Sequence, residues 1–152
     1  MGYLEHIATA AKASQPMMAC TEAEVIAGQG IVGDRYATKR GHYSGWPGAG
    51  RQITLIEAEV LEDLTRQGIP LAPHESRRNL TTRGIRLNPL VGHTLYIGTV
   101  VLEVIRLCEP CAYLQTLLGR PVLQVLVERG GIRCDVRTGG TIRVGDRIRS
   151  ML

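Results

Sequence analysis

Short segments in which apolar and polar residues alternate, separated by tight glycine turns, recur along most of this chain and predict β-strands. Each strand buries one face, so successive strands must pair side by side around a shared core. The alternation covers residues 3–8, 51–56, 95–97 and 100–107, and it returns at the end, where Ile132, Cys134 and Val136 share one face and Ile142 and Val144 follow a Gly139-Gly140 turn.

Two to three short helices are expected among these strands. In the stretch EAEVLEDLTRQG, the apolar residues Val60, Leu61 and Leu64 share a helical face, acids fill the first turn, and Gly68 ends the helix. Residues 110–118 and 121–129 each have Pro near the start and Gly just after the end, which is typical of short helices. The pattern predicts a mainly β fold, an antiparallel or mixed β-barrel with helices inserted.

The composition predicts one globular domain spanning residues 1–152. The chain has five Tyr, one Trp and no Phe, so Leu, Val and Ile must build the core. No segment approaches the roughly 20 apolar residues of a membrane span, and the N-terminus lacks the pattern of a signal peptide. These features favour a cytoplasmic location with no membrane contact.

The stretch GQGIVGDR has the G-x-G-x-x-G spacing of a dinucleotide-binding turn. That turn must leave a buried strand and open a helix. Upstream there is no β-branched run long enough for a central strand, and residues 34–50 are rich in Gly and Pro without helical periodicity. We therefore expect these glycines to permit positive φ and a close backbone approach, and not to bind a dinucleotide.

The positive charge is concentrated in the second half of the chain. Residues 1–76 hold 6 basic and 9 acidic side chains, residues 77–152 hold 12 and 5, and 16 of the 18 basic residues are Arg. Arginine suits bidentate contacts with phosphate or carboxylate, so an anion site is one interpretation; a solvated face rich in Arg is the other. Nucleic acid is a poor fit, because no aromatic residues alternate with the basic ones.

The four cysteines are expected to be reduced thiols. In RLCEPCAYL, a cysteine follows Pro where a strand ends and a helix opens, a position that favours the thiolate as nucleophile or metal ligand. The alternative is that Cys108 and Cys111, the two cysteines of this stretch, are small residues packed in the core. A thioredoxin-like site would need a preceding βαβ unit, which the pattern does not supply, and a structural zinc would need a second C-x-x-C.

Seven blocks in order resemble a stand-alone MOSC domain, the family named after the C-terminal domain of molybdenum-cofactor sulfurases. They are GQGIVGDRYA, RQITLIEAE, RRNLTTRGI, LVGHTLYIG, CEPCAYL, RGGIRCDV and GGTIRVGDRI, spanning about residues 28–148. The resemblance implies a closed β-barrel of the pyruvate-kinase barrel type. It also implies a molybdenum cofactor (Mo-molybdopterin), or sulfur, handled by the cysteine that follows Pro, which is Cys111.

The resemblance also implies the residues of the site. Cys111 is the expected catalytic thiolate and molybdenum ligand, and Asp34 is expected to orient Arg35 or Arg51, unless it is a surface turn residue. Cys108 could be a resolving thiol or filler. The cofactor contacts carried over from the family fall on Gly33, Arg35, Arg51, Gln52, Arg77, Asn79, Arg129, Gly130 and Gly131.

Three functions stay open on the sequence alone. The first is a molybdenum-dependent reductase of N-hydroxylated compounds, an oxidoreductase that takes a small-molecule substrate. Because the chain has no iron–sulfur or flavin segment, that reductase would need an external electron-donor protein. The second is a sulfur carrier or transferase that uses a Cys111 persulfide, and the third is a non-catalytic binding module.

Two further expectations come from the family. Larger relatives add an N-terminal domain over the cofactor, and a homodimer could supply that missing wall here. Pyridoxal phosphate binding is associated with the family through fused desulfurase partners, and only Lys12 and Lys39 could form a Schiff base.

Overall fold

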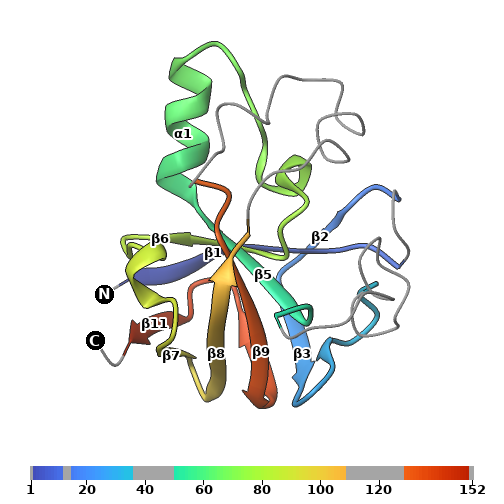
Figure 1. Cartoon of the computed structure of the whole chain (residues 1–152). Helices are drawn as coiled ribbons and strands as arrows, with labels where there is room; N and C mark the ends of the chain where they lie inside the picture. The colour runs from blue at the N-terminus through green and yellow to red at the C-terminus, as the bar shows by residue number, and fades with distance from the viewer. Residues whose placement is uncertain (1, 12–14, 36–49, 109–128, 151–152) are drawn as a thin grey trace.

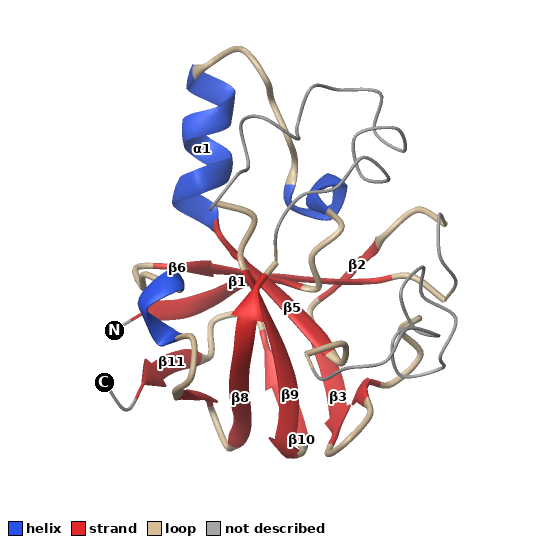
Figure 2. Ribbon diagram, in the orientation of Figure 1, coloured by secondary structure: helices blue, strands red, loops and turns tan. Residues whose placement is uncertain are grey.

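The computed structural model describes residues 2–11, 15–35, 50–108 and 129–150. Strands dominate them (Figure 2). Seven of the described strands close a mixed barrel in the order β11-β7-β8-β9-β5-β6-β1, and β1 pairs back onto β11. The barrel strands are β1 (Gly2–Thr9), β5 (Ile53–Glu57), β6 (Leu80–Arg83), β7 (Thr94–Ile97), β8 (Val100–Leu107), β9 (Ile132–Thr138) and β11 (Arg147–Ser150). The predicted mainly β barrel is therefore confirmed.

The pair β5–β6 is parallel, with Leu55 opposite Leu80, whereas the other barrel pairs are antiparallel. A parallel pair needs a crossover connection, and here the crossover contains the helix α1 (Ala58–Arg66) and the short 3-10 helix η1 (Pro73–Ser76). Figure 1 shows α1 rising from the end of β5. Its buried face contains Val60, Leu61 and Leu64, as the sequence pattern predicts, together with Ala58.

The barrel is filled by aliphatic side chains. Ile132, Cys134 and Val136 of β9 all point into the core, which confirms the face predicted for this strand. Leu95, Ile97, Val100 and Leu102 enter it from the hairpin β7–β8, whose predicted bounds the structure matches closely. Because the described core contains no Phe or Trp, its packing depends on branched Leu, Ile and Val, as the composition requires.

A smaller three-stranded sheet stands beside the barrel, in the order β10 (Gly140–Arg143), β3 (Glu22–Ile26) and β4 (Gly30–Ile31). The glycines of GQGIVGDR form the β3–β4 turn and its exit, and Gly28, Gly30 and Gly33 all have positive φ. They belong to an antiparallel hairpin, and the described residues 28–35 do not form the strand-to-helix turn that dinucleotide binding requires.

One sequence expectation is wrong in detail. The Gly139-Gly140 step, expected as a turn, is a one-residue break between β9 and β10, and β10 pairs with β3 of the small sheet. Ile142 is buried, as expected for a strand, but Val144 is 45% exposed because it lies in the turn that follows β10. Val144 continues the apolar alternation of β10, but the strand ends at Arg143, so alternation alone misplaces the end of this strand.

The remaining described elements are the strand β2 (Met18–Cys20), which pairs with the end of β1, and the 3-10 helix η2 (Asn88–Leu90). The described part of the chain therefore has one α-helix and two 3-10 helices. The helices expected at 110–118 and 121–129 lie almost entirely outside the described residues, as do Lys12 and Lys39. Among the helices that the structure describes, none has the length and apolar content needed to cross a membrane.

Gly30 and Gly28 provide a matched test of the β3–β4 turn. A Cβ on Gly30 would lie 2.3 Å from the carbonyl oxygen of Gln52, at a φ of +118°, whereas Gly28 has a φ of +75° and open space around it. We expect Gly30→Ala to lower the unfolding free energy by about 3 kcal/mol, from strain and overpacking together. Gly28→Ala should cost about 1 kcal/mol, and denaturant titration measures both. Equal losses would show that the contact with Gln52 carries no weight.

Candidate functional site

Three arginines are buried together where β1 ends and β6 begins. Arg35, Arg77 and Arg78 expose only 4%, 8% and 6% of their surface. Arginine is almost never buried unless its charge and its donors are satisfied, so each must have partners. We call these three residues the arginine cluster.

Asp34 holds the first member of the arginine cluster. Its side chain is fully buried, and its Oδ1 accepts hydrogen bonds from Arg35 Nη1 and from the backbone N–H of Ala10, each at 3.1 Å. Arg35 also donates from Nη2 to the carbonyl of Arg77 at 3.0 Å. Asp34 is thus buried and pairs with Arg35, which fits the interpretation that it orients a neighbouring arginine better than that of a surface turn residue.

Arg77 connects the arginine cluster to the chain after β1. It has a φ of +63° and is the one non-glycine residue of the described chain with a positive φ. This left-handed conformation ends η1 and lets the carbonyl of Arg77 face Arg35 while its guanidinium donates to the carbonyl of Gln15. Such backbone strain persists only where surrounding contacts fix it.

Asn79, which precedes β6, fastens three strands. Its Oδ1 accepts from the backbone N–H and the hydroxyl of Thr54, at 3.1 and 3.2 Å, and its Nδ2 donates to the carbonyl of Ala8 at 3.3 Å. The amide is fully buried. The side chain predicted to contact a cofactor therefore already joins β1, β5 and β6.

Arg78 lies between these two residues and makes the most far-reaching contacts. Its guanidinium donates to the carbonyls of Gly130 (2.8 Å), Cys108 (3.1 Å) and Ser76 (3.2 Å). Sequence reasoning selected Arg77 and Asn79 and missed this residue. A signal was present, because Arg78 is two positions before the buried Leu80 and so shares its face if the strand is extended backwards.

Gly130 and Gly131 permit an unusually close packing of three segments. A Cβ on Gly130 would lie 2.1 Å from the carbonyl oxygen of Cys108, and one on Gly131 would lie 1.8 Å from that of Leu55. The backbone N–H of Cys108 donates to Gly131 at 2.7 Å. The sequence predicts that these two glycines bind a cofactor. The fold itself requires glycine at both positions, because a Cβ at either would overlap a backbone carbonyl oxygen.

The cysteines differ in accessibility. Cys111 lies outside the described residues. Cys108 and Cys134 are buried, and burial raises the pKa of the Cys134 thiol, helped by the nearby Asp135 carboxylate and Cys108. Burial also raises the pKa of Cys20. High pKa values keep the Cys20 and Cys134 thiols protonated and poorly nucleophilic.

Arg51 and Gln52 lie at the opposite end of the β5–β9 ladder from Arg129. Gln52 Oε1 accepts from the backbone N–H of Val136 at 2.7 Å. Arg129 instead precedes β9, whose first residue, Ile132, pairs with Leu55. The backbone points from which Arg51 and Arg129 extend are therefore about 13 Å apart or more. The predicted site residues fall into separate groups.

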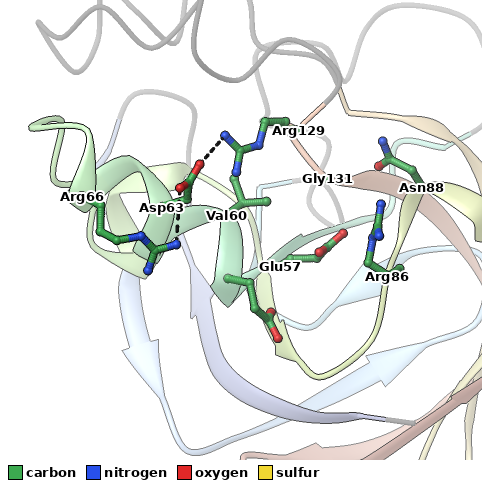
Figure 3. A pocket seen from close by; sticks show the side chains of 9 residues that line it. Glu57, Val60, Asp63, Arg66, Arg86, Asn88, Arg129 and Gly131 are labelled. Atoms are coloured by element: carbon green, nitrogen blue, oxygen red, sulfur yellow. Dashed lines mark hydrogen bonds and ion pairs between the residues drawn. The ribbon is translucent and has the colours of Figure 1, made fainter.

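Arg129 and Gly131 border a cleft of about 390 Å³ between α1 and the residues before η2 (Figure 3). Arg129 pairs with Asp63 at 2.7 Å, and Arg66 pairs with the other oxygen of that carboxylate at 3.3 Å. The hydrogen bond from Arg129 is the main reason that the pKa of Asp63 lies below its ordinary value. Sequence reasoning did not select the further lining residues Glu57, Glu59, Val60, Arg86 and Asn88.

Metal-binding groups are a separate question. Within the described ranges, no three or more His, Cys, Asp or Glu side chains gather closely enough to hold a metal ion.

The Asp34–Arg35 pair gives a test of how far the site depends on its buried charges. Asp34→Asn keeps the shape of the side chain but removes the negative charge that pairs with Arg35, so we expect a loss of about 3 kcal/mol in unfolding free energy. Glu22→Gln is the matched control, because the Glu22–Arg143 pair is about 60% exposed on both sides. That control should stay within about 0.5 kcal/mol. Comparable losses from the two variants would contradict a special role for Asp34.

Comparison with known structures shows where this fold occurs. The YuaD protein from Bacillus subtilis superposes with a TM-score of 0.80 at 19% identity, over 98% of this chain and 94% of that one. YiiM from Escherichia coli gives a TM-score of 0.68 at 18% identity, over 100% of this chain and 70% of YiiM. YiiM from Geobacillus stearothermophilus gives 0.58 at 21% identity, over 69% and 56%. At these identities the likeness concerns the fold.

No curated protein matches the sequence significantly. The sequence model of the MOSC domain, however, matches residues 32–149, which is most of the chain and includes β5, the arginine cluster and every barrel strand after them. This protein therefore belongs to the MOSC domain family.

Proposed function

We propose that this protein binds the molybdenum cofactor and reduces N-hydroxylated compounds, with the Cys111 thiolate as the metal ligand. Membership of the MOSC family supports an association with this cofactor. The observation that carries the proposal to particular residues is the position of Arg78. It contacts both ends of the segment that contains Cys111, namely the carbonyls of Cys108 and Gly130.

The charge of the arginine cluster fits an anionic cofactor. Asp34 pairs with Arg35, whereas the partners of the buried Arg78 guanidinium among the described residues are neutral carbonyl groups. A cofactor with a phosphate and a dithiolene carries negative charge that such a cation favours. The arginine cluster therefore fits this cofactor in its charge and in its hydrogen-bond donors.

Each residue has a stated role in this proposal. Arg77, with Arg35 behind it, would balance the phosphate, and the Cys111 sulfur would ligate the metal. When bound, the molybdenum centre supplies the redox chemistry that removes oxygen from the substrate. The protein provides the anion-binding charge and the thiolate, and a separate electron-donor protein would supply reducing equivalents. Arg51, Gln52 and Arg129 remain proposed contacts on the resemblance alone.

Elemental and mass analysis of protein purified from a cofactor-producing host tests this function. We expect molybdenum and a pterin in the wild type and neither in Cys111→Ser, while Cys108→Ser and Cys20→Ser keep most of both. Cys20 and Cys108 are suitable controls, because one is partly exposed and the other buried beside the same segment. A mass increase of about 32 Da on Cys111 without molybdenum would instead identify a persulfide sulfur carrier. Loss of molybdenum in Cys108→Ser but not in Cys111→Ser would show that Cys111 is not the metal ligand.

A second prediction concerns Arg77. Replacing it by Lys keeps the charge but removes the planar fork that spans two oxygens, so molybdenum retention should fall about tenfold or more. The control is Arg143→Lys, because Arg143 is 62% exposed and pairs with Glu22 on the small sheet. Both are measured as molybdenum per folded protein, beside the melting temperature. Equal retention in the two variants would remove Arg77 from the site.

A further inference from the structure

The cleft between α1 and the residues before η2 carries charges of both signs. Its volume of about 390 Å³ is in the range of sites for small molecules. Three carboxylates and three guanidinium groups line it, from Glu57, Glu59, Asp63, Arg66, Arg86 and Arg129. Their formal charges cancel, and Val60 is the one apolar side chain among the described residues of these walls. A ligand that suits the cleft is therefore polar and carries little net charge.

Two of the carboxylates hold the loop that forms one wall of the cleft. Glu57 Oε2 accepts a hydrogen bond from the backbone N–H of Leu87 at 3.1 Å. Glu59 Oε2 accepts one from the backbone N–H of Gly84 at 2.8 Å. These bonds hold the loop 84–87 against the start of α1 at both of its ends. A side chain on this loop therefore extends from a fixed backbone.

Arg86 is on this loop, is exposed and lines the cleft. Within the described residues, its guanidinium has no carboxylate partner, whereas the other two arginines of the cleft both pair with Asp63. In Figure 3 that group of three side chains lies on the opposite side of the view from Arg86. The Glu57 carboxylate bonds the backbone of the residue after Arg86, yet no ion pair joins these two described side chains. Arg86 is thus a held cation whose donors suit an incoming carboxylate.

The two glutamates place the opposite charge beside Arg86. Each uses one carboxylate oxygen for the backbone of the loop, and the second oxygen of Glu59, Oε1, is buried without a hydrogen-bond partner in the described part of the chain. A buried acceptor that lacks a donor is costly. A positively charged N–H group in the cleft is attracted by both carboxylates, whereas the two negative charges of a phosphate are repelled by them.

We propose that this cleft binds a free α-amino acid, with the carboxylate of the ligand on Arg86 and its ammonium group facing Glu57 and Glu59. An α-amino acid carries both charges on one carbon atom. The protein groups are close in the same way, because Glu57 bonds the residue next to Arg86. The polar walls favour a polar side chain on the ligand. This site uses neither a thiol nor a metal, so the inference goes beyond the proposed function and does not depend on it.

The experiment titrates the protein with each standard L-amino acid in turn, while NMR follows the backbone amides of Gly84 and Leu87. These amides donate to the two glutamates of the cleft, so an ammonium group that draws on the same carboxylates must shift their resonances. We expect at least one amino acid to shift both amides at millimolar concentration or below. No shift with any of them would overturn the inference.

For the amino acid that binds most tightly, two derivatives separate the roles of its charges. Its C-terminal amide lacks the carboxylate, and its N-acetyl form lacks the ammonium group. Each should bind about tenfold more weakly, as the loss of one charge-assisted contact implies. An N-acetyl form that binds as tightly as the free amino acid would overturn the inference. Tighter binding of inorganic phosphate would also overturn it, because the site would then be one for anions.

Variants assign the two charges to particular residues. Arg86→Gln, at an exposed position, should weaken amino-acid binding about tenfold and abolish the preference over the C-terminal amide. Glu57→Gln should instead abolish the preference over the N-acetyl form. The matched control is Arg137→Gln, because Arg137 is 57% exposed, pairs with Glu103 and lies about 20 Å along β9 from Gly131. Equal weakening by Arg86→Gln and Arg137→Gln would overturn the inference, since binding would then follow the overall charge of the protein.

Discussion

The parallel pairing of β5 with β6 is the constraint on which the site depends. The other barrel pairs are antiparallel, so this pair alone obliges the chain to leave the barrel and return from the opposite end. That excursion carries α1 along the outside and then delivers Arg77, Arg78 and Asn79 to the start of β6. Asn79 locks the return by bonding Thr54 of β5 and Ala8 of β1. Without this connection the arginine cluster would have no fixed place.

The site also illustrates how a mainly aliphatic barrel accommodates charge. Its core cluster is aliphatic apart from one cysteine, and the buried charged groups Asp34, Arg35, Arg77 and Arg78 lie outside the strands. There the backbone has carbonyls that are not used in the sheet, and guanidinium groups satisfy them. Burial of arginine is thus tolerated in two ways, by an ion pair for Arg35 and by backbone carbonyl acceptors for Arg78.

The sequence predicted the elements well and the arrangement of side chains poorly. Alternation along β8 and β9 and the helical period of α1 are local signals, so they could be read directly. The pairing of β10 with β3 could not, because strand partners are chosen by long-range packing. The abundance of arginine suggested an anion site, but the described partners of the Arg78 guanidinium are backbone carbonyls, which leave no trace in composition.

Asp34 is a second residue whose surroundings the sequence did not determine. Its place in a glycine-rich turn suited a surface residue as well as a buried one, and only the return of the chain beside Ala10 decides between them. The resemblance to the MOSC family could name candidate residues, yet these fall at different ends of the β5–β9 ladder. A family pattern can identify candidate functional residues, but it does not show which of them are in contact in the folded chain.

The contacts of Arg78 have a consequence for sequence variation. Because it binds carbonyl oxygens, the side chains at positions 76 and 108 do not themselves take part in the bonds with its guanidinium. Substitutions at those two positions would keep the bonds from Arg78 to the carbonyls of residues 76, 108 and 130 as long as the backbone conformation is unchanged. Position 130 differs, since any Cβ there meets a carbonyl oxygen. Arg78 and Gly130 should therefore vary together among relatives, whereas the guanidinium places no such demand on the side chains at positions 76 and 108.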